Sequence, residues 1–575
     1  MKFFHVYNEE CFKGLEKNGL INKDTGFKIQ HCFAVPYEKK FNEFAAKGGK
    51  LHSMIKKDNI PFYVDRIAGG ITYHKYDFDK ELIKEYIDLL GEWFLGFQLH
   101  ESGSNRRRND WQRILRLNDG SHGPYDAKKL RELTIRDYAQ LPDGTPLSAF
   151  SQDTPEFYAN IRYAETPEEF FEEMRDLFKR RMSEVEGRIL PCDSGYLATK
   201  IQDEVGMNTF MPEVGCQIVL MRLAVSVARG MAKASKKMWG TYYECWRNTV
   251  EEDGNVVYTM PCFNLDPTNE WYLTQQMHPD DFTSYGENGG SSRLLQNRIY
   301  YYSLMAGADY MGEEWGLNCS YTDMQDFTLS EYGIVKKNFI NKALTLRNVK
   351  AKIPFAVVLP KDYSCVEIYD YKRDDVGEYL LCKLAGVQKE RFGHINDIIK
   401  LLFERTSEIG NEGHVITNSR FPDVFDIIYE DASDEAFRQY DYLIDATKTG
   451  DFLAANKNKG YKILESRDLN KLEKELQALI PEVMPCYADD LCYLVSEDEN
   501  GSKYFSIFNN EGNERCLRRG NIIHREADKT VKVTFKEAAN ISVIAEGADP
   551  VKIERIDDFN YNITVPAASF AVIRF

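Results

Sequence analysis

Apolar and polar positions alternate in a regular way over residues 1–350. Short apolar runs, such as FFHVY, FLGFQLHE and NTFMPEVG, are each followed by a segment with apolar residues at helical spacing. We predict strands at 3–7, 27–35, 61–66, 94–101, 188–194, 208–215, 238–246 and 309–316. We predict the following helices at 11–20, 41–56, 80–90, 168–186, near Tyr196, 217–237, 292–305 and 331–347.

Strands that alternate with helices are typical of a parallel sheet, because each helix carries the chain back to the start of the next strand. Eight such units predict a closed (β/α)8 TIM barrel over residues 1–350. The fourth predicted strand is then FLGFQLHE, the seventh is MWGTYYECW, and the eighth is DYMGEEWG.

Two smaller domains are predicted after the barrel. Residues 351–485 contain the strands IPFAVVLP, DVFDIIYED and YDYLIDAT among helical stretches, which predicts a small doubly wound, flavodoxin-like α/β domain. It carries no GxGxxG or Walker loop that would indicate a nucleotide. Residues 486–575 change to period-2 alternation, as in KYFSIFNN and SFAVIRF, which predicts a C-terminal all-β sandwich.

Polar side chains gather where the predicted barrel strands end. TIM-barrel enzymes carry their chemistry at the carboxyl ends of the strands, while the rest of each strand packs the interior. The long connections at 102–166 and 247–291 are irregular in pattern, and loops of that length are usually functional. The strand-end residues are Asp65, Arg66, Gln98, His100, Glu101, Asp193, Glu213, Tyr243, Glu244, Glu313 and Glu314.

Two of these carboxylates suit glycosidic bond hydrolysis. Glu101 ends the fourth predicted strand and Glu244 ends the seventh. Such a reaction needs one carboxyl group that protonates the leaving oxygen and a second that attacks or stabilises the anomeric carbon.

This arrangement resembles glycoside hydrolase clan A, in which a glutamate ending strand four is the acid/base and one ending strand seven is the nucleophile. The order of barrel, small α/β domain and β domain is similar to that of the family-42 β-galactosidases. The resemblance implies a retaining mechanism with Glu101 as acid/base and Glu244 as nucleophile. The clan usually places asparagine before the acid, and here His100 stands at that position.

Other roles for these carboxylates remain open. Glu101 could instead be a structural partner of Arg66, and Glu213, Glu313 or Glu314 could replace Glu244 as the nucleophile. Aromatic side chains at strand ends could stack on sugar rings or simply pack. The candidate substrate-binding residues are Asp65, Arg66, His100, Asn105, Glu213, Tyr243, Trp246, Glu314 and Trp315.

Composition narrows the classes of partner. The net charge of −17 disfavours a nucleic-acid partner. No signal peptide or membrane span is recognised, and the twelve cysteines form no CxxC pair, which is typical of reduced thiols in the cytoplasm. With no HExxH motif either, we expect neither a metal nor another cofactor. By the resemblance, the small α/β domain could serve homo-oligomer formation.

The sequence therefore predicts a cytoplasmic glycoside hydrolase that acts on a small glycoside or oligosaccharide. The alternative is a catalytically inactive barrel that binds carbohydrate. A lyase or isomerase is a weaker option, because no lysine is found at the end of a predicted strand.

Overall fold

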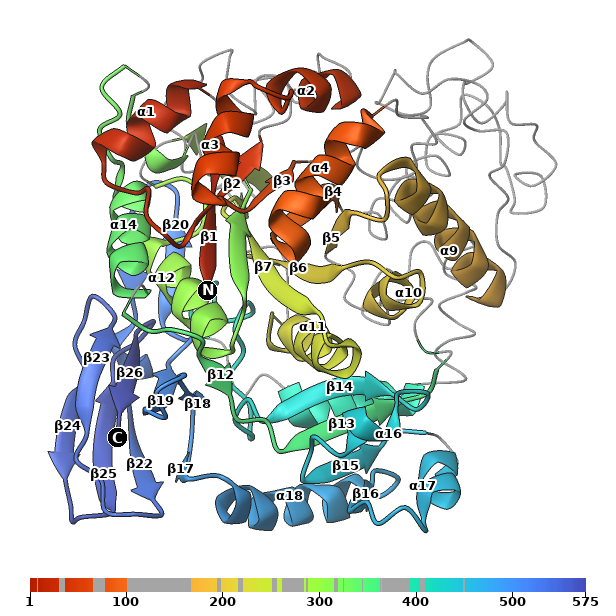
Figure 1. Cartoon of the computed structure of the whole chain (residues 1–575). Helices are drawn as coiled ribbons and strands as arrows, with labels where there is room; N and C mark the ends of the chain where they lie inside the picture. The colour runs from red at the N-terminus through yellow and green to blue at the C-terminus, as the bar shows by residue number, and fades with distance from the viewer. Residues whose placement is uncertain are drawn as a thin grey trace, which may run out of the picture. The chain divides into compact units, whose positions relative to one another are not determined.

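The structure is a computed structural model of the whole chain (Figure 1). It describes residues 1–7, 9–29, 37–65, 78–100, 167–193, 198–215, 221–250, 256–260, 284–285, 288–314, 319–323, 325–343, 345–361, 363, 393–403, 409–447 and 450–575. No helix in these ranges is long and apolar enough to cross a membrane.

Eight parallel strands form a closed barrel in the order β1-β11-β7-β6-β5-β4-β3-β2. All eight are the strands predicted from the apolar runs, so the expected TIM barrel is confirmed, with β4 and β7 as its fourth and seventh strands. The strands are β1 (Lys2–Tyr7), β2 (Thr25–Ile29), β3 (Phe62–Val64), β4 (Phe94–His100), β5 (Ile189–Asp193), β6 (Thr209–Gly215), β7 (Met238–Glu244) and β11 (Tyr310–Glu313).

The helices after these strands follow local sequence signals. The helix predicted at 80–90 has these bounds, and the Asp79 side chain accepts a 3.0 Å hydrogen bond from the amide of Leu82 at its start. The single helix predicted at 41–56 is wrong, because Gly48, with φ of 78°, interrupts it and two helices form. The helices are α1 (Glu9–Lys17), α2 (Tyr37–Phe44), α3 (Lys50–Asp58), α4 (Lys80–Leu90), α9 (Pro167–Glu184), α10 (Ala198–Glu204), α11 (Met221–Ser235), α12 (Arg293–Met305) and α14 (Glu331–Ala343).

The connection after β7 is partly regular, although its sequence pattern is irregular. It contains β8 (Arg247–Val250), β9 (Val256–Met260) and β10 (Ser284–Tyr285), which form a small sheet in the order β10-β9-β8. The first strand of this sheet begins three residues after Glu244, the last residue of β7.

The chain divides into two compact units. One comprises residues 1–30, 213–359 and 397–575, and the other comprises residues 31–212 and 360–396. Within the first, β1 pairs with β2 and β11, and β11 pairs with β7. Within the second, β3 pairs with β4, and β5 pairs with β4 and β6.

The first unit also contains a four-stranded parallel sheet in the order β14-β13-β15-β16. Its strands are β13 (Phe355–Leu359), β14 (Phe425–Tyr429), β15 (Tyr442–Asp445) and β16 (Ile463–Glu465), followed by α18 (Leu469–Val483). Helix α11 lies against β14 (Figure 1), and a Cβ atom at Gly230 would lie 2.3 Å from the carbonyl oxygen of Ile427. Only glycine permits so close an approach of helix and strand.

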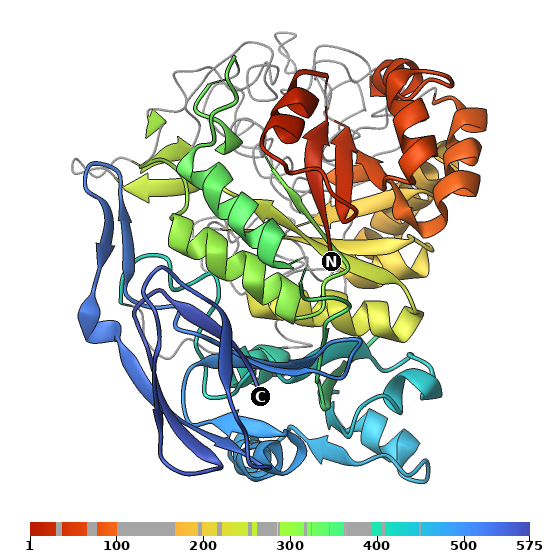
Figure 2. The same ribbon diagram turned by 60° about the vertical axis from the view of Figure 1, so that its left-hand side comes forward.

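The end of the chain forms antiparallel sheets (Figure 2). The first has the order β12 (Lys350–Ala351), β18 (Cys492–Glu497), β19 (Lys503–Phe508), β26 (Phe570–Arg574) and β23 (Ser542–Glu546). The second has the order β17 (Cys486–Ala488), β22 (Lys529–Phe535), β25 (Asn560–Val565) and β24 (Lys552–Arg555). A separate hairpin joins β20 (Asn513–Cys516) to β21 (Gly520–Ile523).

Candidate active site

The contacts of Lys28 identify the inner face of the barrel in the first unit. Its ammonium group donates a 2.9 Å hydrogen bond to the carbonyl oxygen of Glu313 and lies 3.5 Å from the hydroxyl oxygen of Tyr242. In the barrel, β1 and β11 lie between β2, which carries Lys28, and β7, which carries Tyr242. Because a side chain can make these contacts only through the interior, both Lys28 and Tyr242 point inward.

Glu244 belongs to the same inner face. Side chains alternate between the two faces of a strand, so Gly240, Tyr242 and Glu244 point to one side of β7. Paired residues of neighbouring strands point to the same face, and Tyr310 of β11 pairs with Gly240. Gly312 and Glu314, two and four residues later, therefore point inward as well. Glu244 thus lies at the carboxyl end of its strand, as predicted from the sequence, and its side chain points into the barrel.

Gly215 lies directly against the carboxylate of Glu244. A Cβ atom at Gly215 would be 2.2 Å from the main-chain oxygen of Glu244 and 2.5 Å from its Oε2, so only glycine lets Glu244 and its carboxylate lie this close. Glu213 is two residues earlier on β6 and on the same face as Gly215. The ends of β6 and β7 therefore bring two carboxylates, each about 1% exposed, to one region of the barrel.

Glu314 and Trp246 form a second contact at this end of the barrel. The indole Nε1 of Trp246 donates a 2.8 Å hydrogen bond to Oε2 of Glu314. The amide of Glu314 donates to the carbonyl oxygen of Tyr243 at 2.9 Å, which continues the pairing of β7 and β11. Trp246, two residues after Glu244, and Glu314, the residue after β11, are thus held together. Both were predicted to bind substrate.

Glu313 points to the opposite face of β11. Its carboxylate forms an ion pair with Lys336 of α14 and accepts hydrogen bonds from Tyr332, at 3.0 Å, and from Tyr300. Burial, followed by the charge of Glu313, raises the pKa of Tyr300 and of Tyr332 well above the ordinary value. These phenols therefore stay protonated as donors, and the arrangement favours a structural role for Glu313.

Tyr243 also lies on the side of the helices. Its ring is stacked on that of Tyr332 with centroids 6.2 Å apart, and its hydroxyl is hydrogen-bonded to Ser291. The contact of Tyr243 with substrate stays a prediction. The observed contacts of its side chain stabilise β7 from the side of the helices.

The remaining predicted residues are described only in part. Asp65 directly follows β3 and is fully buried in the second unit. His100 is the last residue of β4, and its side chain is outside the described part of the structure. The same holds for the whole of Glu101, Arg66, Asn105 and Trp315, whose roles stay predictions.

Lys28 is a residue that the sequence reading missed. We expected no lysine at the end of a strand, and this is wrong, because Lys28 is the next-to-last residue of β2. It lies within an apolar run, FKIQHCFAV, and its side chain is fully buried. A charged residue in such a run is the one signal that could have marked it.

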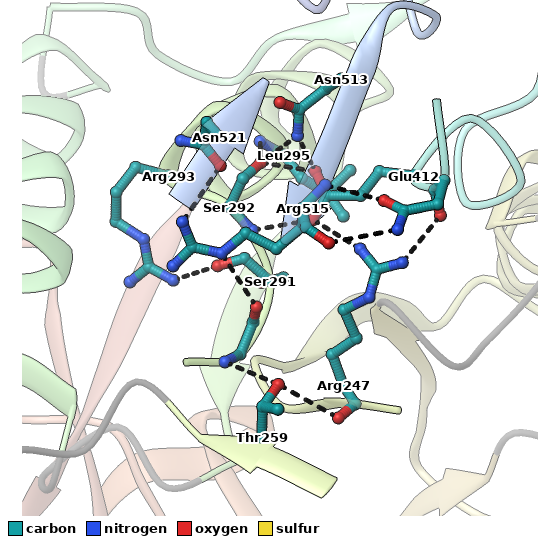
Figure 3. A network of polar contacts seen from close by, with 12 residues as sticks. Arg247, Thr259, Ser291, Ser292, Arg293, Leu295, Glu412, Asn513, Arg515 and Asn521 are labelled. Atoms are coloured by element: carbon teal, nitrogen blue, oxygen red, sulfur yellow. Dashed lines mark hydrogen bonds and ion pairs between the residues drawn. The ribbon is translucent and has the colours of Figure 1, made fainter. Parts of the chain in front are cut away.

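A buried polar network fixes the segment that follows β7 (Figure 3). Glu412 is at its centre, with no exposed surface, and forms an ion pair with Arg247 at 3.3 Å. The amide and hydroxyl of Ser292 donate to the Glu412 carboxylate at 2.8 and 2.5 Å, and Asn513 of β20 donates to it as well. The hydroxyl of Ser292 also caps α12 by accepting from the amide of Leu295 at 3.0 Å.

This network holds the start of α12 against the strand that carries Glu244. The amide of Ser291 donates to the carbonyl oxygen of Cys245 at 2.9 Å. Arg515 of β20 donates to the carbonyl oxygen of Gly289 at 3.2 Å. It also donates to Asn521 of β21 at 3.1 Å (Figure 3). The β20–β21 hairpin is thus part of the scaffold of the proposed site.

The pKa values of two members of this network are shifted by their surroundings. Burial alone would raise the pKa of Glu412, but the Arg247 guanidinium and the hydrogen bonds from Ser292 outweigh it, so the pKa lies below the ordinary 4.5. Burial and the neighbouring guanidinium of Arg293 lower the pKa of Arg515 to about 10. Glu412 and Arg515 are therefore both charged near neutral pH.

The described residues contain no group of three or more His, Cys, Asp or Glu side chains that could hold a metal ion. Cys245 and Cys319, whose sulfur atoms are 3.5 Å apart, are both buried free thiols.

Comparisons with known proteins give only remote similarity. Neither protein-family models nor curated proteins match the sequence. Among solved structures, α-L-fucosidase isoenzyme 2 from Paenibacillus thiaminolyticus is similar with 10% identity and a TM-score of 0.37, over 95% of this chain and 98% of that one. The cold-adapted β-galactosidase from Rahnella sp. R3 has 9% identity and a TM-score of 0.41, over 100% of this chain and 98% of that one. At these TM-scores neither likeness supports a conclusion about mechanism or substrate.

Proposed function

We propose that this chain is a glycoside hydrolase that cleaves the glycosidic bond of a small glycoside or oligosaccharide. The observation that carries the proposal is the inward-facing Glu244 at the carboxyl end of β7, with Glu213 at the neighbouring strand end and Gly215 leaving space for the carboxylate. Glycosidic bond hydrolysis uses two carboxyl groups, and TIM-barrel enzymes carry their catalytic residues at the carboxyl ends of the barrel strands.

The proposed mechanism uses Glu244 and Glu101 and retains the anomeric configuration. Glu244 attacks the anomeric carbon while Glu101 protonates the leaving oxygen, which gives a covalent glycosyl-enzyme. Glu101 then removes a proton from water, which attacks the same carbon and releases the sugar. This mechanism requires the two carboxyl groups to be about 5–5.5 Å apart.

The other predicted residues have supporting roles in the proposal. Trp246 and Trp315 offer ring faces to the sugar, and hydroxyl groups of the substrate are bound by polar side chains. These are Asp65, Arg66, His100, Asn105, Glu213, Tyr243 and Glu314. The bond from Trp246 to Glu314 supports this by fixing the orientation of the indole ring.

The proposal extends to the organisation of the whole chain. We propose a barrel domain at 1–350, a flavodoxin-like domain at 351–485 that could mediate homo-oligomer formation, and a β-sandwich at 486–575. The four-stranded parallel sheet and the antiparallel sheets support the last two assignments. A carbohydrate substrate, no nucleic-acid or membrane partner and a cytoplasmic location complete the proposal.

The proposal is tested with Glu101→Gln and Glu244→Gln on a panel of α- and β-aryl glycosides. We expect kcat to fall by about 1000-fold or more in both variants, because each removes a group that forms or breaks bonds. Glu331→Gln is the matched control for Glu244→Gln, because Glu331 is an exposed glutamate of the same unit as Glu244. It should keep the kcat of the unmodified protein.

Other results would change the assignment. If both variants keep the turnover of the unmodified protein, the two carboxylates are not the catalytic pair. If the unmodified protein binds sugars but cleaves none of the glycosides, it is the carbohydrate-binding barrel that the sequence left as an alternative.

A further inference from the structure

Lys28 is a fully buried lysine inside the barrel, at the carboxyl end of β2. Removing an ammonium group from water is costly unless other polar groups replace the water. Its contacts with the carbonyl oxygen of Glu313, at 2.9 Å, and the hydroxyl of Tyr242, at 3.5 Å, meet this need. The ammonium also lies 5.5 Å from the centre of the Tyr242 ring. Such a residue in an apolar strand calls for a specific role.

The position of Lys28 relates it to the proposed nucleophile. Tyr242 precedes Glu244 by two residues on the same face of β7, which places their Cβ atoms about 7 Å apart. The other charged groups on this inner face of the first unit near its carboxyl end, among the described residues, are Glu213 and Glu314. Lys28 therefore supplies positive charge to a region that is otherwise rich in carboxylates.

We propose that Lys28 is a positioning residue of the active site. Its ammonium group holds the Tyr242 side chain and the carbonyl end of β11 in place beside Glu244, and its charge favours the ionised carboxylate that must attack the sugar. This inference rests on the proposed function, since it assigns Lys28 to the reaction in which Glu244 is the nucleophile. It also gives a reason for a buried charge that the fold alone does not require.

The hydrogen bond of Lys28 to a main-chain carbonyl oxygen is consistent with an orienting role rather than a covalent one. A lysine that forms a Schiff base must be neutral so that its lone pair can attack a carbonyl carbon. The hydrogen bond to the Glu313 carbonyl oxygen orients the Lys28 nitrogen toward the end of β11. The geometry therefore favours an electrostatic and orienting role over a lyase-type nucleophile.

The test compares Lys28→Gln, which keeps a donor but loses the charge, with Lys28→Arg, which keeps the charge. With an aryl glycoside that the unmodified protein cleaves, we expect Lys28→Gln to lower kcat by about tenfold or more, with KM changed less than about threefold. The acidic limb of its kcat/KM profile should move up by about 0.5 pH unit or more, because Glu244 loses a cation that favours ionisation. Lys28→Arg should recover most of kcat.

Lys336→Gln is the matched control, because Lys336 is also buried but pairs with Glu313 on the outer face of β11. It should lower the unfolding temperature and leave the pH profile in place. Circular dichroism checks that each variant folds. If Lys28→Gln does not fold, the test compares the kcat/KM pH profile of Lys28→Arg with that of the unmodified protein. We expect the acidic limb to differ by less than about 0.2 pH unit.

Three results would overturn the inference. Folded Lys28→Gln could keep normal kcat and an unchanged pH profile, or Lys28→Arg could shift the profile as far as Lys28→Gln does. Borohydride could also trap a substrate-derived adduct on Lys28, which would make it a nucleophile. Failure of the proposed function looks different, because Glu244→Gln would then keep normal turnover whatever happens at Lys28.

Discussion

Gly215 and the Glu244 carboxylate share one space inside the barrel: a Cβ atom at Gly215 would lie 2.5 Å from Oε2 of Glu244. A separation this short cannot persist, so Gly215→Ala must displace the carboxylate or the strand. We expect kcat to fall by about 100-fold or more and stability to fall by about 1–3 kcal/mol. Gly413→Ala is the control, because its nearest neighbour would be at an ordinary 3.4 Å. Normal kcat in Gly215→Ala would show that Glu244 need not occupy this position.

The bond between Trp246 and Glu314 makes a separate prediction. Trp246→Phe keeps an aromatic face but loses the Nε1 donor that holds Oε2 of Glu314 at 2.8 Å. We expect KM to rise by about 5- to 30-fold, corresponding to about 1–2 kcal/mol, with a smaller change in kcat. Trp239→Phe, at the opposite end of β7, should leave KM unchanged. An unchanged KM in Trp246→Phe would remove Trp246 from the proposed sugar site.

Glu313→Gln separates the structural carboxylate of β11 from the proposed catalytic one. The substitution leaves the buried Lys336 without its ion-pair partner, so we expect a loss of about 3–5 kcal/mol in stability. Turnover per folded molecule should stay within about threefold, since the carboxylate faces the helices. The double variant Glu313→Gln with Lys336→Met should regain part of the stability. A loss of turnover as large as that of Glu244→Gln would instead support Glu313 as nucleophile.

Glu412 predicts a pH-dependent contribution to stability. Its pKa in the folded protein is below the ordinary 4.5, so its charge stabilises the fold fully above about pH 4.5. This contribution is lost as the pH falls through the folded pKa. We therefore expect Glu412→Gln to unfold at a lower temperature than the unmodified protein at pH 7, with a difference that shrinks below pH 4.5. Thermal unfolding between pH 3.5 and 7 checks this, and a difference independent of pH would contradict it.

The sequence predicted the eight barrel strands because each is a short apolar run followed by a helical pattern. It also placed Glu213 and Glu244 at strand ends, which the structure confirms. It could not predict which face each side chain occupies, since Tyr242, Tyr243 and Glu244 are all buried and alternation gives no polarity signal in such a strand. The contacts of Tyr242 with Lys28, and of Tyr243 with Ser291 and Tyr332, separate the inner residues from the outer ones.

The sequence also gave no means of finding partners that are distant along the chain. Glu412 is 165 residues from Arg247 and 120 from Ser292, and it belongs to a segment with no recognisable motif. The same is true of Lys28, which contacts Tyr242 and Glu313, 214 and 285 residues away. Such contacts arise when the fold brings segments together, so local patterns carry no trace of them.

The central claim, that Glu244 is the nucleophile, is tested most directly by identifying the residue that becomes glycosylated. A 2-deoxy-2-fluoro glycoside matching an aryl glycoside that the protein cleaves slows breakdown of the glycosyl-enzyme, and mass spectrometry of the digested protein locates the label. We predict a label on Glu244, with none in Glu244→Gln. A label on Glu213 or Glu314, or inversion of the anomeric centre in the product, would contradict the assignment.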